Sequence, residues 1–267
     1  WAPTRARGRS RSVGRAVAAW GRGVCPSRSG GSSSMCGQAI PSPFAHGTEC
    51  RARGRVPLNK VPHVADLCNP EWRAILDDMA AMFPMDAGHF HRKVWEFCHI
   101  VYALKRAGVL HPANQGLAVG AGREQILYYL AHKVRRMVAV DLYQGSYLGG
   151  EDEPDIPEHP DKYAPFLYPR ENLSFQRMDA LDLQFPGDSF DFVFSASSIE
   201  HFGAEAQIAR SLAEMHRVLK PGGVCVITSE IRLNRLAGRV PHTRLFAADR
   251  LLDLFRSCGF VLVEEGL

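Results

Sequence analysis

The sequence predicts an α/β fold, a doubly wound and mostly parallel sheet with helices on both faces. Two observations carry this prediction. From residue 117 onward, short apolar runs alternate with longer amphipathic segments, which is typical of parallel strands joined by crossover helices. The first apolar run is followed by the glycine turn Gly120-Ala121-Gly122, at the place where such sheets commonly approach a ligand.

The expected elements follow this alternation. Asn69-Pro70-Glu71 can cap and begin a helix that runs to Met82. A second N-terminal helix is predicted from His89 to Arg106, because its apolar residues recur every three or four positions. Strands are predicted at 117–119, 137–140, 173–176, 190–194, 224–227 and 260–263, and later helices at 124–131, 205–219 and 248–257. Residues 143–172 contain five prolines and are expected to be a long insertion.

Composition divides the chain into a leader (1–55), a helical cap (56–112) and a main domain (113–267). The leader holds ten Arg, no Lys and one acid, Glu49, although the whole chain carries a net charge of only +4. Because it is also rich in Gly and Ser, we expect a disordered leader. It can be interpreted as a nucleic-acid-binding arm, a transit peptide or a non-native extension. The last is favoured, since the chain begins with Trp1 and its first Met is Met35.

Charge and cysteine content limit the function classes. Without the basic leader, the rest of the chain is net acidic, so a nucleic-acid partner is not expected for the domain. No apolar run has the length that a membrane span requires. The seven cysteines are widely spaced and form no CxxC pair, which argues against a disulfide framework and a zinc site. A cytoplasmic location and no metal are therefore expected, and the oligomeric state is not predicted.

The candidate ligand site consists of residues at the ends of predicted strands. Gly120 and Gly122 allow a tight turn and a close backbone approach. Asp141 ends the second strand about twenty residues later, where a carboxylate can accept both ribose hydroxyls; the alternative is a turn-capping Asp. Asp179-Ala180 follows the third strand, where an acid can accept from an adenine amino group or, equally well, close a turn.

With Phe190-Asp191-Phe192-Val193 and Leu219-Lys220-Pro221-Gly222-Gly223, these motifs resemble, in order and spacing, those of class I S-adenosylmethionine-dependent methyltransferases. The resemblance covers about residues 113–265 and implies a Rossmann-like fold with S-adenosylmethionine as cofactor. It also implies a set of cofactor contacts: Gly120, Ala121 and Gly122 under the methionine and ribose, Asp141 and Leu142 at the ribose, Asp179 and Ala180 at the adenine, and Ser195 beside the cofactor.

The chain departs from the family pattern at two places. The family usually has an acid two residues before the first glycine, near the cofactor's amino group; this chain has Ala118, and Glu124 is a candidate substitute. The family sheet closes with a seventh, antiparallel strand between the fifth and sixth, but this chain stops at Leu267. A C-terminally truncated fragment is therefore expected, in which the sixth strand leaves backbone groups unpaired or pairs differently.

The resemblance implies methyl transfer to a small-molecule acceptor, such as a sugar or a natural-product hydroxyl or amine. The segment from Ser198 to Phe202 is similar to that of small-molecule methyltransferases. A hydroxyl acceptor benefits from a general base, for which His201 is the candidate and Glu200 a weaker one; His201 can instead cap a helix. The insertion and the N-terminal helices are expected to set acceptor choice.

Three other functions stay open at this point. One is a methyltransferase-fold binding protein without activity, which Ala118 and the absent seventh strand favour. The second is a nicotinamide-dependent oxidoreductase. Gln125 counts against this function, because the dinucleotide-binding fingerprint has Gly or Ala at that position. The turn from Lys220 to Gly223 also counts against it. The third is a nucleic-acid methyltransferase, which the acidic domain disfavours.

Overall fold

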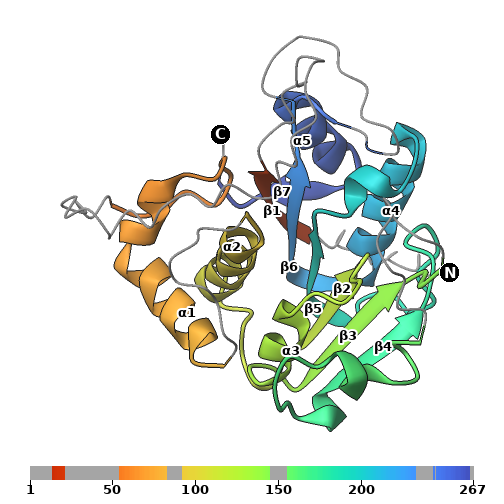
Figure 1. Ribbon diagram of the computed structural model, residues 1–267. Coiled ribbons are helices and arrows are strands. Elements are labelled where there is room, and N and C mark those ends of the chain that lie inside the picture. Colours follow the sequence, from red (N-terminus) through yellow and green to blue (C-terminus); the bar gives the residue numbers. More distant parts are fainter. Residues whose placement is uncertain are drawn as a thin grey trace, which may run out of the picture.

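The computed structural model describes residues 14–21, 54–82, 92–144, 155–232, 243 and 245–264, and for 14–21 the backbone alone. At its centre lies a seven-stranded sheet in the order β4-β3-β2-β5-β6-β1-β7 (Figure 1). Every neighbouring pair is parallel. The strands are β1 Gly14–Gly21, β2 Gln115–Val119, β3 Arg136–Asp141, β4 Leu173–Arg177, β5 Phe190–Ala196, β6 Leu219–Glu230 and β7 Phe260–Leu262. The predicted α/β fold is confirmed.

Five α-helices surround the sheet in the described part of the chain: α1 Pro70–Ala80, α2 Arg92–Arg106, α3 Ile126–Ala131, α4 Glu205–Val218 and α5 Ala248–Ser257. Helix α1 begins as predicted, because the Asn69 side chain accepts hydrogen bonds from the N–H groups of Glu71 and Trp72 at 3.0 and 3.2 Å. Residues 89–91, the start of the second predicted helix, lie outside the described residues.

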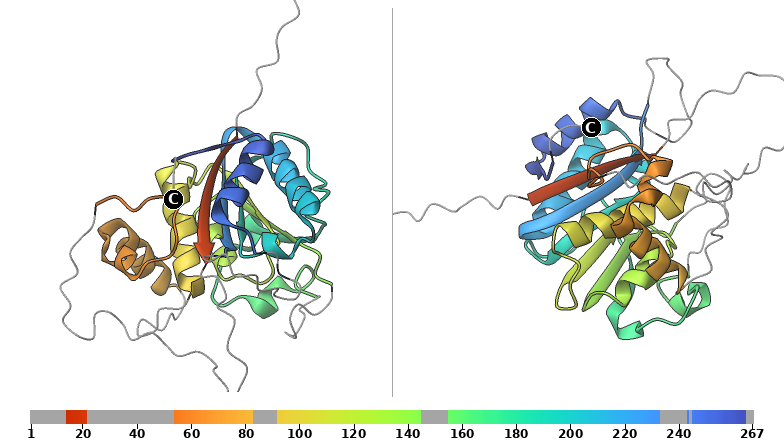
Figure 2. Two further views of the ribbon diagram at one scale, coloured as in Figure 1. Left: turned by 90° about the horizontal axis from the view of Figure 1, so that it is seen from above. Right: turned by 90° about the vertical axis from the view of Figure 1, so that its left-hand side faces the viewer.

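Two hydrophobic cores lie on the two faces of the sheet. Along β5, Phe192 and Phe194 pack with buried residues of α2 and α3, whereas Val193 packs with those of α4 and α5. This alternation follows from the two-residue period of a strand. The left view of Figure 2 shows the same layers, with α1 and α2 on one side of the sheet and α4 and α5 on the other. Apolar strands buried on both faces are what a parallel sheet requires.

Strand β1 contradicts the expectation of a disordered leader at residues 14–21. It runs parallel between β6 and β7, and Ala16 is paired with Cys225 on one side and with Leu262 on the other. Of the two outcomes expected for the sixth strand, the structure shows the second: it pairs differently, with β1 between β6 and β7 and in the parallel direction. Uncovered strand edges leave backbone groups unpaired, which explains why a short segment of the leader is held there. Residues 1–13 and 22–53 of the leader lie outside the described part.

The described part of the insertion, residues 155–172, packs against α3. The Tyr128 hydroxyl donates to the Pro160 carbonyl at 3.1 Å, and the Tyr128 ring meets that of Tyr168 edge-on at 5.0 Å between centroids. Short 3-10 helices lie at Pro160–Tyr163 and Arg170–Asn172, and others at Val64–Cys68 and Ile199–His201. Residues 145–154 are outside the description.

The described residues bear on three expectations from the sequence, which concern membrane spans, metal sites and disulfides. None of their helices has the length and apolar character to cross a membrane. No cluster of three or more His, Cys, Asp or Glu in these ranges is placed to hold a metal ion. Cys98, Cys225 and Cys258 are free thiols, but Cys68 is disulfide-bonded. One disulfide-bonded cysteine is not a disulfide framework, so the inference against such a framework stays a prediction.

A buried aromatic cluster joins α1 to α2 and predicts a pH-dependent stability. His99 is fully buried, stacks on Trp95 at 4.7 Å and hydrogen-bonds the Leu58 carbonyl through Nε2 at 2.9 Å. Burial lowers the pKa of His99 to about 4, with Lys60 lowering it further and Asp66 opposing. The folded protein therefore disfavours the imidazolium, and its stability is full above pH 6.5 and falls as the pH drops toward 4.

We expect the free energy of unfolding to lose about 2 kcal/mol from this residue between pH 8 and pH 5, since one pKa unit corresponds to about 1.4 kcal/mol. Urea unfolding at both pH values would measure it. His99→Gln keeps a donor for Leu58 but cannot titrate, so this variant should lose clearly less stability over the same interval. Equal losses in both proteins would exclude His99 as the cause.

Candidate functional site

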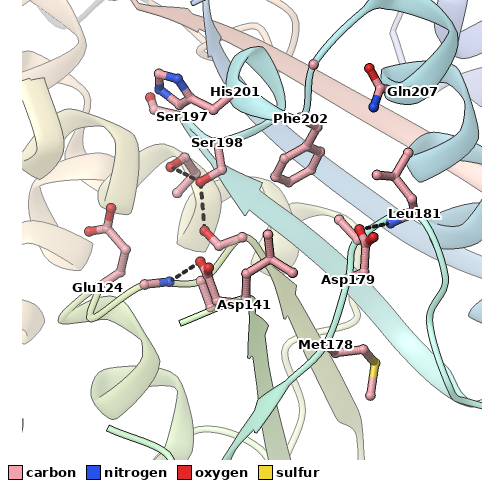
Figure 3. A pocket seen from close by; sticks show the side chains of 17 residues that line it. Glu124, Asp141, Met178, Asp179, Leu181, Ser197, Ser198, His201, Phe202 and Gln207 are labelled. Atoms are coloured by element: carbon pink, nitrogen blue, oxygen red, sulfur yellow. Dashed lines mark hydrogen bonds between the residues drawn. The ribbon is translucent and has the colours of Figure 1, made fainter. Parts of the chain in front are cut away.

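A cavity of about 530 Å³ opens at the carboxyl ends of β2, β3, β4 and β5. This is the edge where open α/β sheets bind their ligands, and the volume is in the usual range for small-molecule sites. Figure 3 shows the side chains around it. The lining residues are Gly120, Ala121, Gly122, Glu124, Asp141, Leu142, Met178, Asp179, Ala180, Leu181, Ala196, Ser197, Ser198, His201, Phe202, Gly203 and Gln207.

The glycine turn forms the floor of this cavity. Both Gly120 and Gly122 have positive φ, at +66° and +47°, a conformation that side chains with a Cβ rarely adopt. At Gly120 a Cβ would also lie 2.6 Å from Ser198 Cβ, whereas at Gly122 it would meet no atom within 4 Å. The first glycine therefore lets β2 pack closely on the residues after β5, and the second leaves space on the cavity side.

Asp141 lies at the end of β3 beside this turn. Its Oδ2 accepts a hydrogen bond from the Gly122 N–H at 2.9 Å, and its Oδ1 accepts a longer one from the Tyr143 N–H at 3.4 Å. The Tyr143 hydroxyl in turn donates to the Gly122 carbonyl at 3.2 Å. These bonds orient the carboxylate next to the glycine turn and join the ends of β2 and β3. Leu142 follows as a partly exposed apolar wall.

Asp179 and Ala180 line the side of the cavity beyond β4. Asp179 Oδ1 accepts from the Leu181 N–H at 2.9 Å, which is the turn-closing role that the sequence left open. The side chain is nevertheless exposed and on the cavity wall. Met178, Ala180 and Leu181 add apolar surface around it, so a flat apolar ring and a polar edge group can both be accommodated.

The segment after β5 forms the opposite wall. Ser198 Oγ donates to the Gly120 carbonyl at 2.7 Å, which fixes this segment to the glycine turn. Ser197 has a positive φ of 52° and is held there because its N–H donates to the Thr228 carbonyl at 2.8 Å. His201, at the end of the 3-10 helix, lines the cavity as predicted (Figure 3).

Two predicted site residues lie elsewhere. Glu200 is buried and turned toward β6, where its carboxylate accepts from Ser229 Oγ at 2.9 Å and from the Glu230 N–H at 3.2 Å; this burial raises its pKa. Ser195 is buried on the same side of β5 as Val193, because side chains alternate along a strand. Neither residue lines the cavity, so the structure does not support direct contact of either with a ligand.

Several lining residues were not predicted as site residues: Met178, Leu181, Ala196, Ser197, Ser198, Phe202, Gly203 and Gln207. Ser197 and Ser198 could have been found from the rule that ligands bind beyond the carboxyl ends of strands, had the end of β5 been placed at Ala196. Glu124 does line the cavity, and it forms an ion pair with Lys93 of α2.

Comparison with known proteins gives matches to methyltransferases. Residues 117–227 match a family model described as "Methyltransferase domain". A "Probable S-adenosylmethionine-dependent methyltransferase" from Mycolicibacterium smegmatis is 35% identical over 105 residues, which is 38% of each chain. A demethylmenaquinone methyltransferase from Symbiobacterium thermophilum is 29% identical over 129 residues, 36% of this chain and 50% of that one. The chain thus spans half or less of the length of these curated relatives.

Among solved structures, the [4+2]-cyclase SpnF superposes with a TM-score of 0.50 and 18% identity over 71% of this chain and 68% of its own. At this identity the likeness concerns the fold alone. Over residues 117–227 the chain is thus similar to S-adenosylmethionine-dependent methyltransferases.

Proposed function

We propose that this domain transfers a methyl group from S-adenosylmethionine to a small-molecule acceptor in the cavity beside the glycine turn. The observation that carries the proposal is the meeting of Gly120, Asp141 and Asp179 on one cavity that His201 also lines. In Figure 3, Asp141 lies between Glu124 and Asp179, so the polar groups are spread along the cavity as an elongated ligand requires.

The residues present fit the cofactor. Asp141 offers carboxylate oxygens to ribose hydroxyls, and the exposed Asp179 offers an acceptor to the adenine amino group. Met178, Ala180 and Leu181 provide apolar contact for the ring. The open space at Gly122 allows the backbone to approach the ligand closely. Together these groups would hold the cofactor in one orientation.

The chemistry that the cofactor supplies when bound is an electrophilic methyl group. The protein's part is to align the acceptor with it and to exclude water. His201 is the proposed general base for a hydroxyl acceptor. Its backbone is positioned by Glu200, the preceding residue, which is hydrogen-bonded to β6. Glu200 therefore acts as a support for His201 in this proposal and not as a proton acceptor.

A second candidate is a binding protein, or an enzyme of another kind, on the same fold. The superposed structure is named a cyclase, so this fold is compatible with more than one activity. The proposals of a cytoplasmic location, and of acceptor choice by the insertion and the N-terminal helices, stay predictions. A nicotinamide-dependent oxidoreductase is not favoured, because the matched model and curated relatives are methyltransferases.

The two candidates differ in turnover. We expect the full chain to form S-adenosylhomocysteine from S-adenosylmethionine with some members of a panel of small hydroxyl and amine compounds, as measured by mass spectrometry. With a hydroxyl acceptor, His201→Asn should lower kcat about a hundredfold, which is within the usual contribution of a general base.

The matched control is His132→Asn, because His132 is exposed on the C-terminal end of α3 and does not line the cavity. An unchanged kcat in His201→Asn would exclude His201 from the chemistry. Tight cofactor binding without turnover on any acceptor would favour the binding protein.

A further inference from the structure

Lys93 and Glu124 form a charged pair where α2 meets the glycine turn. The Lys93 ammonium contacts Glu124 Oε1, lies 3.3 Å from Glu96 Oε2 and donates to the Ala196 carbonyl at 3.3 Å. Lys93 therefore holds Glu124 and the end of β5 together.

Glu124 has an acceptor available toward the cavity. It lines the cavity wall, and among the described residues no donor contacts its Oε2. Figure 3 shows the carboxylate on the side of Asp141 opposite to Asp179. A ligand that extends from Asp179 past Asp141 would thus reach Glu124 with its far end. Ala118, which precedes the turn, is a buried methyl group and provides no carboxylate here.

Charge balance indicates what this far end carries. Glu96, Glu124 and Glu230 face only two cations, Arg92 and Lys93, in the described part of the cluster. The Glu96 side chain is fully buried and that of Glu124 only 22% exposed, so among the described residues these carboxylates are poorly solvated. Burial raises the pKa of Glu124, although Lys93 opposes this. A cationic ligand group would satisfy this site.

We propose that Glu124 accepts a hydrogen bond from the α-ammonium of the methionine part of S-adenosylmethionine, and that Lys93 is a positioning residue that holds Glu124 for this contact. The inference rests on the proposed cofactor site. It assigns a separate task to each end of the cavity, with Asp141 and Asp179 binding the adenosine and Glu124 the amino acid.

Two ligands distinguish these tasks. S-adenosylhomocysteine carries the α-ammonium, whereas 5′-methylthioadenosine has the same adenosine and thioether without the amino-acid part. By calorimetry on the full chain, Glu124→Gln should weaken S-adenosylhomocysteine binding at least about tenfold, the equivalent of about 1.4 kcal/mol. Its affinity for 5′-methylthioadenosine should stay within about twofold of wild type. Lys93→Met should show the same selective loss, and Lys93→Arg should restore much of it.

Glu214→Gln is the matched control. Glu214 is paired with Arg217, its side chain is 20% exposed, and it does not line the cavity, so both affinities should be unchanged. Loss of affinity for both ligands in Glu124→Gln, or for neither, would overturn the role of Glu124. Selective loss in Glu124→Gln without any effect of Lys93→Met would overturn the positioning role of Lys93. If wild-type protein binds neither ligand, the proposed cofactor site itself fails, and this inference with it.

Discussion

Replacing Ala16 with proline should lower the free energy of unfolding by at least about 3 kcal/mol. Ala16 lies in β1 and is flanked by β6 and β7, with Cys225 and Leu262 as its neighbours in the sheet. Whether the Ala16 N–H faces β6 or β7, proline at this position removes that hydrogen-bond donor. The proline ring is also incompatible with an interior strand. The effect should be large because the loss of β1 would also expose the edges of β6 and β7.

Ala16→Ser is the control for this variant, because it makes a small change in the side chain and keeps the backbone N–H. Urea unfolding of both variants should give a near wild-type midpoint for Ala16→Ser and a much lower one for Ala16→Pro. Wild-type stability of Ala16→Pro would show that β1 does not belong to the sheet.

The second large effect is expected at Gly120, where alanine should cost about 4 kcal/mol of stability. A residue with a Cβ at a φ of +66° is strained by about 1–2 kcal/mol. In addition, the new Cβ would lie 2.6 Å from Ser198 Cβ and 2.9 Å from the Phe202 ring, and such overpacking commonly costs about 1–3 kcal/mol. Relief of the clash would move the segment that carries His201, so ligand binding should be lost as well.

Gly122→Ala separates strain from clash. This glycine also has a positive φ, but a Cβ there meets no atom within 4 Å. We expect a cost of only about 1–2 kcal/mol in thermal or urea unfolding, together with weaker ligand binding, since the methyl group would occupy space beside the glycine turn. Equal destabilisation by both substitutions would contradict the close packing at Gly120.

The sequence allowed the sheet strands from residue 115 to 262 to be predicted, because each is an apolar run followed by a turn. It also indicated Gly120, Asp141 and Asp179, since their position at strand ends is a local feature. Strand β1 was missed for a physical reason. Its short apolar stretch lies within an Arg-, Gly- and Ser-rich leader, and its partners in the sheet, β6 and β7, lie near the other end of the chain.

The errors at the site have similar causes. Ser195 was chosen where Ser197 and Ser198 line the cavity, because the end of β5 could not be placed to within two residues and side chains alternate along a strand. Glu200 was considered catalytic, but its hydrogen bonds to β6 bury it. The pairing of Glu124 with Lys93 joins residues 31 positions apart and depends on how α2 packs on the sheet.

The most direct test of the cofactor site is calorimetric titration of the full chain, which includes β1, with S-adenosylhomocysteine, and with NAD for comparison. We predict binding in the micromolar range, on the order of −8 kcal/mol, no binding of NAD, and loss of binding in Asp141→Ala with a preserved unfolding transition. A folded protein that binds NAD, or that binds S-adenosylhomocysteine equally well with and without the Asp141 carboxylate, would contradict this site.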